Sequence, residues 1–508
     1  MTEPPPGLPV PLANLSLWQR TVSSHPLLNA RQHEPLPSSA DIVVIGGGLC
    51  GAVVAHALLF PDEHPTLETP ETETTETPKN PKTPKTTETN ENPETAETTE
   101  TTETPETNET PDNGAVGSVV MLEARALASG ASGRNAGHCR PDAGRGFPGY
   151  AKIHGEGEAV HILRSEAVAL QRTGAFIRKN GIECEWTERD TYDVHLSPSF
   201  AEHSAKALDA YVAAGGMPAT HLSSETETRI GCVGATKWRA ATLNPAQLTL
   251  GVIGLCESDE RFKAFSHAPV WHVSKEGEGW MVDGPRGRVR ANKVVWATNA
   301  YRGCAALEGY VQPQGAQAHK LSRAPAGREV FPDLEGSYSL RQSTEVFYSV
   351  APRPDGSIVL GASRGSWPTP LLAANFGCTN DAGWHAAVAS NAFRSWAEMY
   401  PSGGWDYGEE KDMEAAALVP GTEDRPDDNG TVGLEYAWNG IIGVTQDNVP
   451  LVGEVGGEYV AVGYCGHGMA RMFVTGPALA HYIRTGAWDS AMPKSFRVTP
   501  ERLARLRA

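Results

Sequence analysis

The sequence predicts an α/β protein in which two domains are interleaved along the chain. Near its two ends it contains short apolar runs typical of buried parallel strands, at residues 41–45, 294–297 and 459–463. Between them, residues 346–350 and 358–361 flank the turn sequence Pro-Arg-Pro-Asp-Gly, which indicates an antiparallel hairpin. Strands of a parallel sheet in the N- and C-terminal parts of the chain, with antiparallel strands between them in sequence, predict one doubly wound domain and one α+β domain on a mixed or antiparallel sheet. The length of 508 residues is sufficient for two domains that share an interface.

A glycine-rich loop follows the first strand. Gly46, Gly48 and Gly51 match the pattern Gly-x-Gly-x-x-Gly, with Leu49 in the same loop, and an apolar helix is expected over residues 52–59. The first glycine permits a tight turn, the second a close approach of a pyrophosphate, and the third close packing of helix on strand. The helix N-terminus then offers free N–H groups to phosphates. The context predicts a Rossmann-like dinucleotide-binding unit, the alternative being a tight glycine turn without a ligand.

Residues 62–113 are composed almost wholly of Thr, Glu, Pro, Asn and Lys, with 15 acidic residues and three lysines. Such a composition cannot form a core, so we expect a disordered insertion that contributes about −12 of the net charge of −18. We interpret it as a passive expansion of a surface loop, because loop-closure entropy grows slowly with length. The alternative is a regulated or binding segment, since its Thr-Pro sites are phosphorylatable.

The acidic residue expected to bind ribose hydroxyls is Glu123, at the end of a second strand expected over residues 116–122. It lies 77 positions after Gly46, and removing the 52 residues of the polar tract leaves 25. That separation is close to the roughly 20 residues typical of dinucleotide-binding units. A carboxylate here favours a free 2′-hydroxyl, and therefore FAD or NAD over NADP.

Further motifs carry a resemblance to a known family. Leu-Glu-Ala-Arg at 122–125 with Ala-Ser-Gly-Ala-Ser-Gly-Arg-Asn-Ala-Gly-His at 128–138, and Gly-Tyr-Cys-Gly-His-Gly-Met at 463–469, resemble FAD motifs of the D-amino-acid-oxidase-like flavoproteins. That superfamily includes glycine oxidase, sarcosine oxidase and γ-glutamylputrescine oxidase. Val-Trp-Ala-Thr-Asn-Ala-Tyr at 295–301 matches the strand that returns to the nucleotide. Trp-Asn-Gly at 438–440 and Thr-Gln-Asp-Asn-Val-Pro-Leu-Val-Gly at 445–453 are most similar to the γ-glutamylputrescine oxidase branch. The resemblance runs from about residue 38 to 488, apart from the polar tract.

The resemblance implies bound FAD and assigns it a set of binding residues. These are Gly46, Gly48, Leu49, Gly51, Glu123, Ala124, Arg125, Gly130, Ala131, Ser132, Gly133, Arg134, Asn135, Ala136, Gly137, Thr298, Asn299, Thr445, Asp447, Gly466, His467, Gly468 and Met469. Backbone N–H groups of 466–468 would stabilise negative charge on the reduced flavin.

The sequence departs from the family at three places. Glycine oxidase has a carboxylate-clamping Arg where this chain has Ile442, which makes a simple α-amino acid a less favoured substrate. Gly440 stands where monomeric sarcosine oxidase attaches flavin through Cys. Dimethylglycine dehydrogenase attaches flavin through a His near the position of Arg134 and Asn135, and this sequence has no histidine in that spot. We therefore expect non-covalent FAD.

The implied reaction is oxidation of a C–N bond in an amine or N-substituted amino acid. Hydride passes to flavin N5, the imine is hydrolysed, and O2 reoxidises the flavin to give H2O2. His467 is the candidate acid or base, since a histidine serves either role. Candidate substrate residues are Lys152, Arg341, Tyr348 and Cys465.

Three alternatives stay open. The first is an FAD-dependent dehydrogenase or hydroxy-acid oxidase that uses another electron acceptor. The second is an NAD-binding dehydrogenase, which leaves the 463–469 motif unexplained. The third is a non-catalytic flavoprotein whose polar tract is the functional segment.

The expected domain organisation is a Rossmann-like FAD-binding domain interleaved with an α+β substrate domain. The first comprises 38–61, 114–179, 238–312 and 428–488, and the second 180–237 and 313–427. Residues 1–37 are expected to be an irregular lead-in and 489–508 a C-terminal tail. The acidic body lacks a basic stripe, which argues against nucleic-acid binding. Eight scattered cysteines without a Cys-x-x-Cys pair indicate neither disulfides nor a metal site. With no signal peptide or membrane span expected, the predicted location is cytoplasmic.

Overall fold

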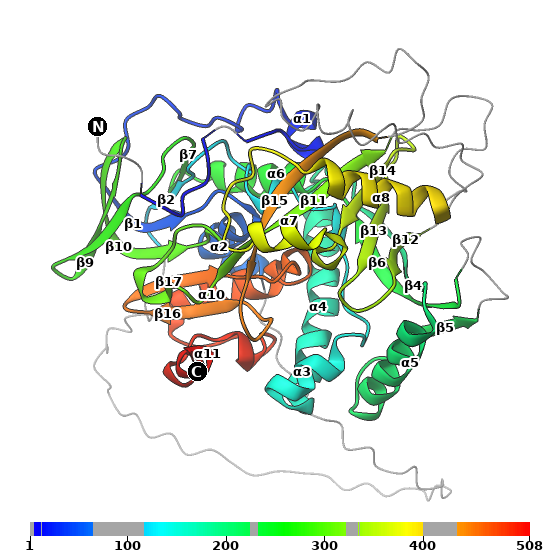
Figure 1. The fold of residues 1–508 in the computed structure, drawn as a ribbon. Helices are drawn as coiled ribbons and strands as arrows, with labels where there is room; N and C mark the ends of the chain where they lie inside the picture. The colour runs from blue at the N-terminus through cyan, green and yellow to red at the C-terminus, as the bar shows by residue number, and fades with distance from the viewer. Residues whose placement is uncertain are drawn as a thin grey trace, which may run out of the picture.

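Two β-sheets lie against each other in the computed structural model, which describes residues 5–11, 13–64, 116–223, 232–321, 334, 336–399 and 434–507 (Figure 1). One sheet is mainly parallel and has eight strands, and the other is mainly antiparallel and has nine. This arrangement confirms the predicted α/β fold class with two mixed sheets.

The parallel sheet is centred on β1 (Ser39–Ile45) and joins segments from every third of the chain. Its core strands, in spatial order after the antiparallel edge strand β16 (Leu451–Val455), are β17 (Glu458–Val462), β10 (Gly287–Trp296), β1, β2 (Val119–Leu122) and β7 (Phe262–Phe265). The hairpin of β8 (His272–Glu276) and β9 (Gly279–Gly284) extends from β10. These strands are buried on both faces, which explains why the sequence shows apolar runs rather than alternation.

Helices cover one face of this sheet. They are α2 (Leu49–Leu59), α4 (Glu156–Asn180), α6 (Pro245–Glu257) and α10 (Met472–Thr485). All 11 residues of α2 are buried, because it lies between the sheet, α6 and α10. Its uniformly apolar sequence suits that position. The helix begins at Leu49 rather than at the expected residue 52, with Gly48 as its N-cap.

The second sheet has the order β15 (Leu434–Val444), β11 (Gln312–Leu321), β14 (Ile358–Ala362), β13 (Phe347–Pro352), β12 (Ser337–Arg341), β4 (Thr187–His195), β6 (Gly234–Thr242) and β3 (His138–Cys139), with β5 (Thr220–Ser223) beside β6. The expected hairpin is present as β13 and β14. Helix α8 (Ala386–Met399) packs on one face of β11 and β14, which leaves the opposite face free to line a site.

The division into domains differs from the expected one. β15 belongs to the second sheet, although residues 428–488 were expected in the FAD-binding domain. The lead-in is not wholly irregular, because α1 (Leu17–Thr21) has a capping box on Ser16 and buries Trp18 against the flavin motif. Nor is 489–508 a detached tail, since α11 (Pro500–Arg507) is anchored by two hydrogen bonds of 2.9 Å between Arg502 and Asp447.

Most of the insertion expected at residues 62–113, from residue 65 on, lies outside the described residues. Its first three residues are described and differ from the prediction. Pro61–Glu63 form a 3-10 helix, and His64 stacks on Phe176 with ring centroids 5.5 Å apart. A hydrogen bond of 2.9 Å joins His64 Nε2 to Nδ1 of the buried His56.

This histidine pair predicts a pH-dependent stability. Burial lowers the pKa of His56 to about 4 and that of His64 to about 3. The folded-state pKa values lie below the ordinary value near 6.5, so the stabilisation is complete above that pH and is lost on acidification. We expect the free energy of unfolding, measured with urea, to fall by about 2 kcal/mol between pH 6.5 and 5. His64→Phe should retain the stacking and show a shallower decline, and equal slopes in the two proteins would contradict the assignment.

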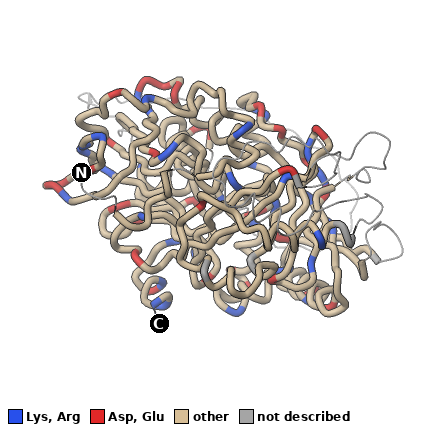
Figure 2. The backbone as a smooth tube through the Cα atoms, turned by 45° about the horizontal axis from the view of Figure 1, so that its top comes forward, with Lys and Arg blue, Asp and Glu red and all other residues tan. Residues whose placement is uncertain are grey.

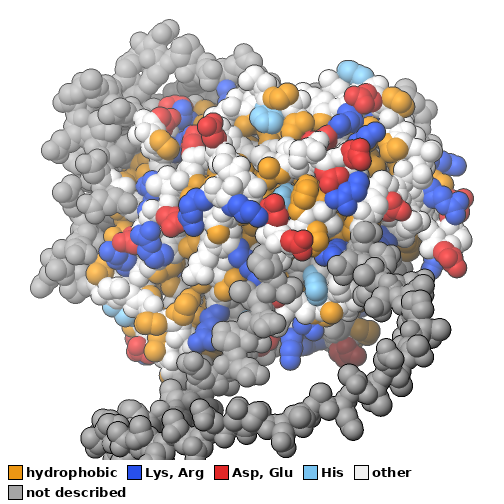
Figure 3. Space-filling model, turned by 180° about the vertical axis from the view of Figure 1, so that it is seen from behind, with side chains coloured by type: hydrophobic (Ala, Val, Ile, Leu, Met, Phe, Trp, Pro, Cys, Tyr) orange, Lys and Arg blue, Asp and Glu red, His pale blue; other side chains and the backbone are white. Residues whose placement is uncertain are grey.

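The charged side chains of the described surface are mixed in sign. Blue and red stretches are scattered among each other over the tube in Figure 2, and the face in Figure 3 shows no continuous basic stripe on its described part. None of the helices in the described ranges has the length and apolarity that a membrane crossing requires.

Candidate active site

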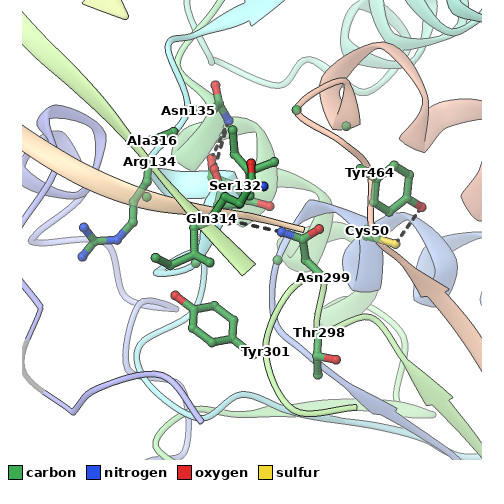
Figure 4. A pocket seen from close by; sticks show the side chains of 18 of the residues that line it. Cys50, Ser132, Arg134, Asn135, Thr298, Asn299, Tyr301, Gln314, Ala316 and Tyr464 are labelled. Carbon is green, nitrogen blue, oxygen red and sulfur yellow. Dashed lines mark hydrogen bonds between the residues drawn. The ribbon is translucent and has the colours of Figure 1, made fainter. Parts of the chain in front are cut away.

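A cavity of about 610 Å³ lies between the two sheets and is lined by both of them (Figure 4). The parallel sheet contributes the glycine loop and the ends of β1, β2 and β10. The second sheet contributes β11, β13, β14 and β15. The cavity therefore opens at the carboxyl ends of the parallel strands, where doubly wound sheets bind ligands.

The glycine loop has the conformation that its motif predicts. Gly46 has a φ of +116°, and a Cβ there would lie 2.6 Å from the Ala297 carbonyl oxygen. A Cβ on Gly51 would lie 2.1 Å from the Gly46 oxygen, inside the turn itself. At Gly48 a Cβ would meet only the Ser132 Oγ, at 2.9 Å. Two of the glycines are therefore required by packing, whereas Gly48 leaves the cavity wall open.

Glu123 and Ser132 tie this loop to the next motif. The Gly47 N–H donates to Glu123 Oε2 at 2.8 Å, and the Arg125 N–H donates to Oε1 at 2.9 Å. The Leu49 N–H donates to Ser132 Oγ at 2.7 Å. The Asn135 amide donates to the Ser132 carbonyl at 3.2 Å, as the dashed lines of Figure 4 show. The two expected FAD motifs thus form one hydrogen-bonded wall.

Two arginines of this wall share a buried carboxylate. Arg125 donates two hydrogen bonds to Asp381, at 2.9 and 3.1 Å, and Arg134 Nε lies 3.3 Å from the same carboxylate. Tyr301 donates its hydroxyl to Asp381 at 3.2 Å, and burial raises the pKa of that phenol. Asp381 is fully buried and comes from the loop before α8. Arg125 and Arg134 are therefore held in this wall by the same buried carboxylate.

The opposite wall is a face of the second sheet that carries small side chains. In the register, Ala318 pairs with Gly361 and Gly361 with Ser349, while Ala316 pairs with Gly440. Directly opposed residues of an antiparallel sheet point to the same face. Phe347 lies on that face beside Ser349. The small side chains of this face leave space between it and Ala136 on the other wall. A Cβ added to Gly361 would lie 3.3 Å from the Cβ of Ala136.

The C-terminal loop closes the cavity between these walls. Cys465 has a φ of +54°, and its Sγ lies 3.2 Å from Thr445 Oγ1. Burial raises the pKa of the Cys465 thiol. His467 lines the cavity, and its Nδ1 lies 3.2 Å from Glu166 Oε1. Gly468–Ala470 form a 3-10 turn that leads into α10.

Most of the predicted FAD-binding residues line the cavity. They are Gly46, Gly48, Glu123, Ala124, Arg125, Gly130, Ala131, Ser132, Arg134, Asn135, Ala136, Thr298, Asn299, Gly466, His467, Gly468 and Met469. Six others lie behind the wall: Leu49, Gly51, Gly133, Gly137, Thr445 and Asp447. Packing requires glycine at both Gly133 and Gly137. A Cβ on Gly133 would lie 2.0 Å from the Ala128 carbonyl oxygen, and a Cβ on Gly137 would lie 2.7 Å from the Trp18 ring.

Of the four predicted substrate residues, only Cys465 lines the cavity. Lys152 is exposed on α3 (Phe147–His154). Tyr348 points to the other face of β13, because it alternates with Phe347 and Ser349, and it packs in the core beneath α8. Arg341 lies behind Phe347, with its guanidinium 4.0 Å from that ring, and binds Asp193 at 2.7 Å.

The described lining residues fit FAD. Thr298 Oγ1 is buried in the cavity wall without a hydrogen-bond partner among the described residues, as expected of a group that awaits a ligand. Gly48 and Gly130 leave their part of the wall without side chains. Arg125 and Arg134 both line the cavity, and guanidinium groups suit a diphosphate.

A family profile matches most of the chain. Residues 112–482 match the family described as FAD dependent oxidoreductase, DAO. The match begins beyond the glycine loop, which the structure brings back to the matched part by pairing β1 with β2 and β10. None of the curated proteins matches the sequence.

Solved structures share the fold. Glycine oxidase from Geobacillus kaustophilus is 17% identical with a TM-score of 0.61, and the alignment covers 91% of this chain and 99% of that one. L-proline dehydrogenase from P. horikoshii is 15% identical with a TM-score of 0.57, covering 92% and 99%. L-α-glycerophosphate oxidase from Mycoplasma pneumoniae, with FAD bound, is 11% identical with a TM-score of 0.57, covering 91% and 100%.

Proposed function

The chain belongs to the DAO family of FAD-dependent oxidoreductases, and from this premise we propose that it oxidises the C–N bond of an amine or N-substituted amino acid. Bound FAD would accept a hydride from the carbon beside nitrogen and pass two electrons to O2, giving H2O2. The imine product would hydrolyse in water. The names of glycine oxidase and L-proline dehydrogenase support a C–N donor, whereas that of glycerophosphate oxidase keeps an alcohol as the second candidate.

The observation that carries the proposal is the uncharged strand face that the second sheet presents to the cavity, with Glu345 in the turn between β12 and β13 as its acidic lining residue. Ala316, Ala318, Ser349 and Gly361 present no charge to the cavity, and Ile442 beside them is apolar. An uncharged face disfavours an ammonium and therefore favours the free amine, which is the form that gives up hydride. Ile442 also lines the cavity where glycine oxidase has its carboxylate clamp, which favours donors other than a simple α-amino acid.

We infer that FAD is held without a covalent bond. Gly440, at one attachment position of the family, offers no nucleophile to the cavity. Cys465 is a cavity thiol, but its raised pKa keeps it protonated, and a thiol is a poor nucleophile. All eight cysteines are free thiols, which fits a reducing compartment such as the cytoplasm.

The test is the visible spectrum of the purified protein before and after anaerobic addition of amines. The panel spans polyamines, their γ-glutamyl derivatives, N-methyl amino acids, plain amino acids and hydroxy acids. Bleaching of the flavin by an amine class, followed by H2O2 on admission of air, is the expected result. Bleaching by hydroxy acids alone would overturn the amine donor, and reduced flavin that persists in air would overturn O2 as acceptor.

Ala316→Leu is expected to separate substrate binding from FAD binding. A leucine there fills part of the cavity from the wall of the second sheet, far along the chain from the glycine loop. We expect kcat/KM for the best amine to fall at least tenfold, about 1.4 kcal/mol, with the flavin content unchanged. Tyr348→Phe, on the opposite face of the same sheet, serves as the control and should leave kcat/KM unchanged. Loss of activity in Tyr348→Phe and not in Ala316→Leu would show that the faces are assigned the wrong way round.

A further inference from the structure

A buried carboxylate lies directly behind the cavity histidine. Glu166 is in the middle of α4, fully buried, and its Oε1 lies 3.2 Å from His467 Nδ1. No local motif marks it, because 301 residues separate the two side chains in the sequence. Through this contact, Glu166 links α4 to the loop at residues 463–469 that resembles the C-terminal flavin motif.

Glu166 is fixed in place by three other donors. Arg471 approaches Oε1 with Nε at 2.9 Å and Nη2 at 2.8 Å, and the Asp142 N–H donates to Oε2 at 2.8 Å. Arg471 is itself held by the Tyr150 hydroxyl at 2.8 Å and the Asn448 carbonyl at 3.3 Å. A carboxylate with this many donors has one position, and so does the ring that it holds.

The carboxylate is ionised. Burial opposes its charge, but the charges of His467 and Arg471 outweigh burial and lower the pKa of Glu166 to about 2. An ionised carboxylate only accepts hydrogen bonds, so the His467 Nδ1 that faces it carries a proton. Nε2 is then the ring nitrogen left for the cavity, and it has no hydrogen-bond partner among the described residues.

We propose that His467 Nε2 accepts the proton that an ammonium substrate must lose before hydride transfer, and that Glu166 is the positioning residue for this step. This rests on the proposed amine donor. An N–H bond of the ammonium breaks, the proton moves to Nε2, and the electron pair stays on the amine nitrogen. The imidazolium that forms is stabilised by the Glu166 carboxylate, and the freed lone pair assists departure of the hydride. The proton returns to solvent after turnover.

The titratable groups around His467 and its partners Glu166 and Arg471 come from three helices and two loops. They are Glu166 on α4, Arg471 at the start of α10, Tyr150 on α3, and Asp142 and Cys465 in loops. Arg471 is salt-bridged to the same oxygen as His467, so removing Glu166 leaves Arg471 as the nearest charge. We therefore expect Glu166→Gln to release the His467 ring from the position in which Glu166 Oε1 holds it.

The first measurement needs no substrate. The absorption spectrum of the oxidised FAD-bound protein is recorded from pH 5 to 9 in wild type, His467→Asn, Glu166→Gln and Asp489→Asn. Asp489 is a buried carboxylate that does not line the cavity. It lies 3.7 Å from Arg172, which is on α4, the helix that also carries Glu166. We expect the pH dependence of the flavin spectrum to be the same in wild type and Asp489→Asn and to change in both His467→Asn and Glu166→Gln. A wild-type spectrum without a transition, or a transition that no variant changes, would overturn the pair.

The second measurement is the rate of anaerobic flavin reduction by the best amine of the panel. We expect His467→Asn to lose about 100-fold or more at pH 7, with recovery above the amine's own pKa, where the substrate arrives deprotonated. A merely structural role predicts the same loss at every pH, and a wild-type rate in His467→Asn would also refute the base. If Glu166→Gln fails to fold, His467→Asn still decides, since His467 is 27% exposed and tolerates replacement. If no amine reduces the flavin of the wild-type protein, the proposed function fails, and the proposed proton transfer fails with it. The pH dependence of the spectrum, which needs no substrate, still tests the contact between Glu166 and His467.

Discussion

Gly51→Ala is expected to yield a protein that neither folds stably nor retains FAD. The new Cβ would lie 2.1 Å from the Gly46 carbonyl oxygen and 3.3 Å from a Val44 methyl carbon. A backbone oxygen cannot rotate away as a side chain does, so the turn and the start of α2 must move apart. Overpacking of this kind costs roughly 3 kcal/mol or more. Thermal unfolding of the apoprotein and titration with FAD, followed by flavin fluorescence, measure the two losses.

Gly48→Ala is the matched control, three residues earlier in the same loop. Its Cβ would meet only the end of the Ser132 side chain at 2.9 Å, and the φ of Gly48 is −90°, which any residue adopts. We expect near-normal unfolding of the apoprotein and at least tenfold weaker FAD binding, because the added methyl group faces the cavity. Equal destabilisation by the two substitutions would show that the motif serves packing only.

The sequence predicts the dinucleotide site well because its signals are local or of fixed spacing. Strand, glycine loop and helix follow one another between residues 39 and 59, and Glu123 is found by subtracting the polar tract. In the structure, Glu123 Oε2 lies 2.8 Å from the backbone nitrogen of Gly47 in the glycine loop, the motif from which the position of Glu123 is predicted. The family resemblance is confirmed by the match over residues 112–482, whereas the γ-glutamylputrescine oxidase branch and the FAD-binding role of each motif residue stay predictions.

The substrate side of the site could not be predicted in the same way, because it depends on strand register. Tyr348 is a candidate substrate residue in the sequence because it lies on the expected hairpin. Side chains alternate between faces, so a choice displaced by one residue selects the wrong face. Phe347 and Ser349 face the cavity, and Tyr348 faces the core.

Asp381 and Glu166 could not be predicted because their partners are distant in sequence. Asp381 lies 256 residues from Arg125, in a stretch, Cys-Thr-Asn-Asp-Ala-Gly, that reads as an exposed loop. Glu166 falls in an amphipathic helix among other charged residues, and 305 residues separate it from Arg471. A carboxylate is ordinarily exposed unless paired, and pairing over such distances leaves no pattern in a single sequence. The same reason explains Asp447, which binds Arg502 rather than the cavity.

Asp381→Asn is expected to destabilise the apoprotein strongly and to increase the stabilisation that FAD provides. The substitution removes the buried carboxylate that pairs with both Arg125 and Arg134 in the cavity wall. Breaking a buried ion pair from one side costs about 3–5 kcal/mol, because the remaining charge is buried without a partner. FAD brings two phosphate charges to a cavity that both arginines line, so its binding should recover part of that cost. Melting temperatures with and without FAD measure both effects.

Asp193→Asn separates this effect from general damage. Asp193 is also a buried carboxylate held by arginines, at 2.9 Å from Arg140 and 2.7 Å from Arg341, but it does not line the cavity. Both substitutions should lower the melting temperature of the apoprotein, and only Asp381→Asn should enlarge the shift caused by FAD. If FAD stabilises the two variants equally, Arg125 and Arg134 serve the fold and not the cofactor. If FAD stabilises Asp381→Asn more than Asp193→Asn, then Asp381, in the loop before α8, influences the affinity for the cofactor through its contacts with Arg125 and Arg134.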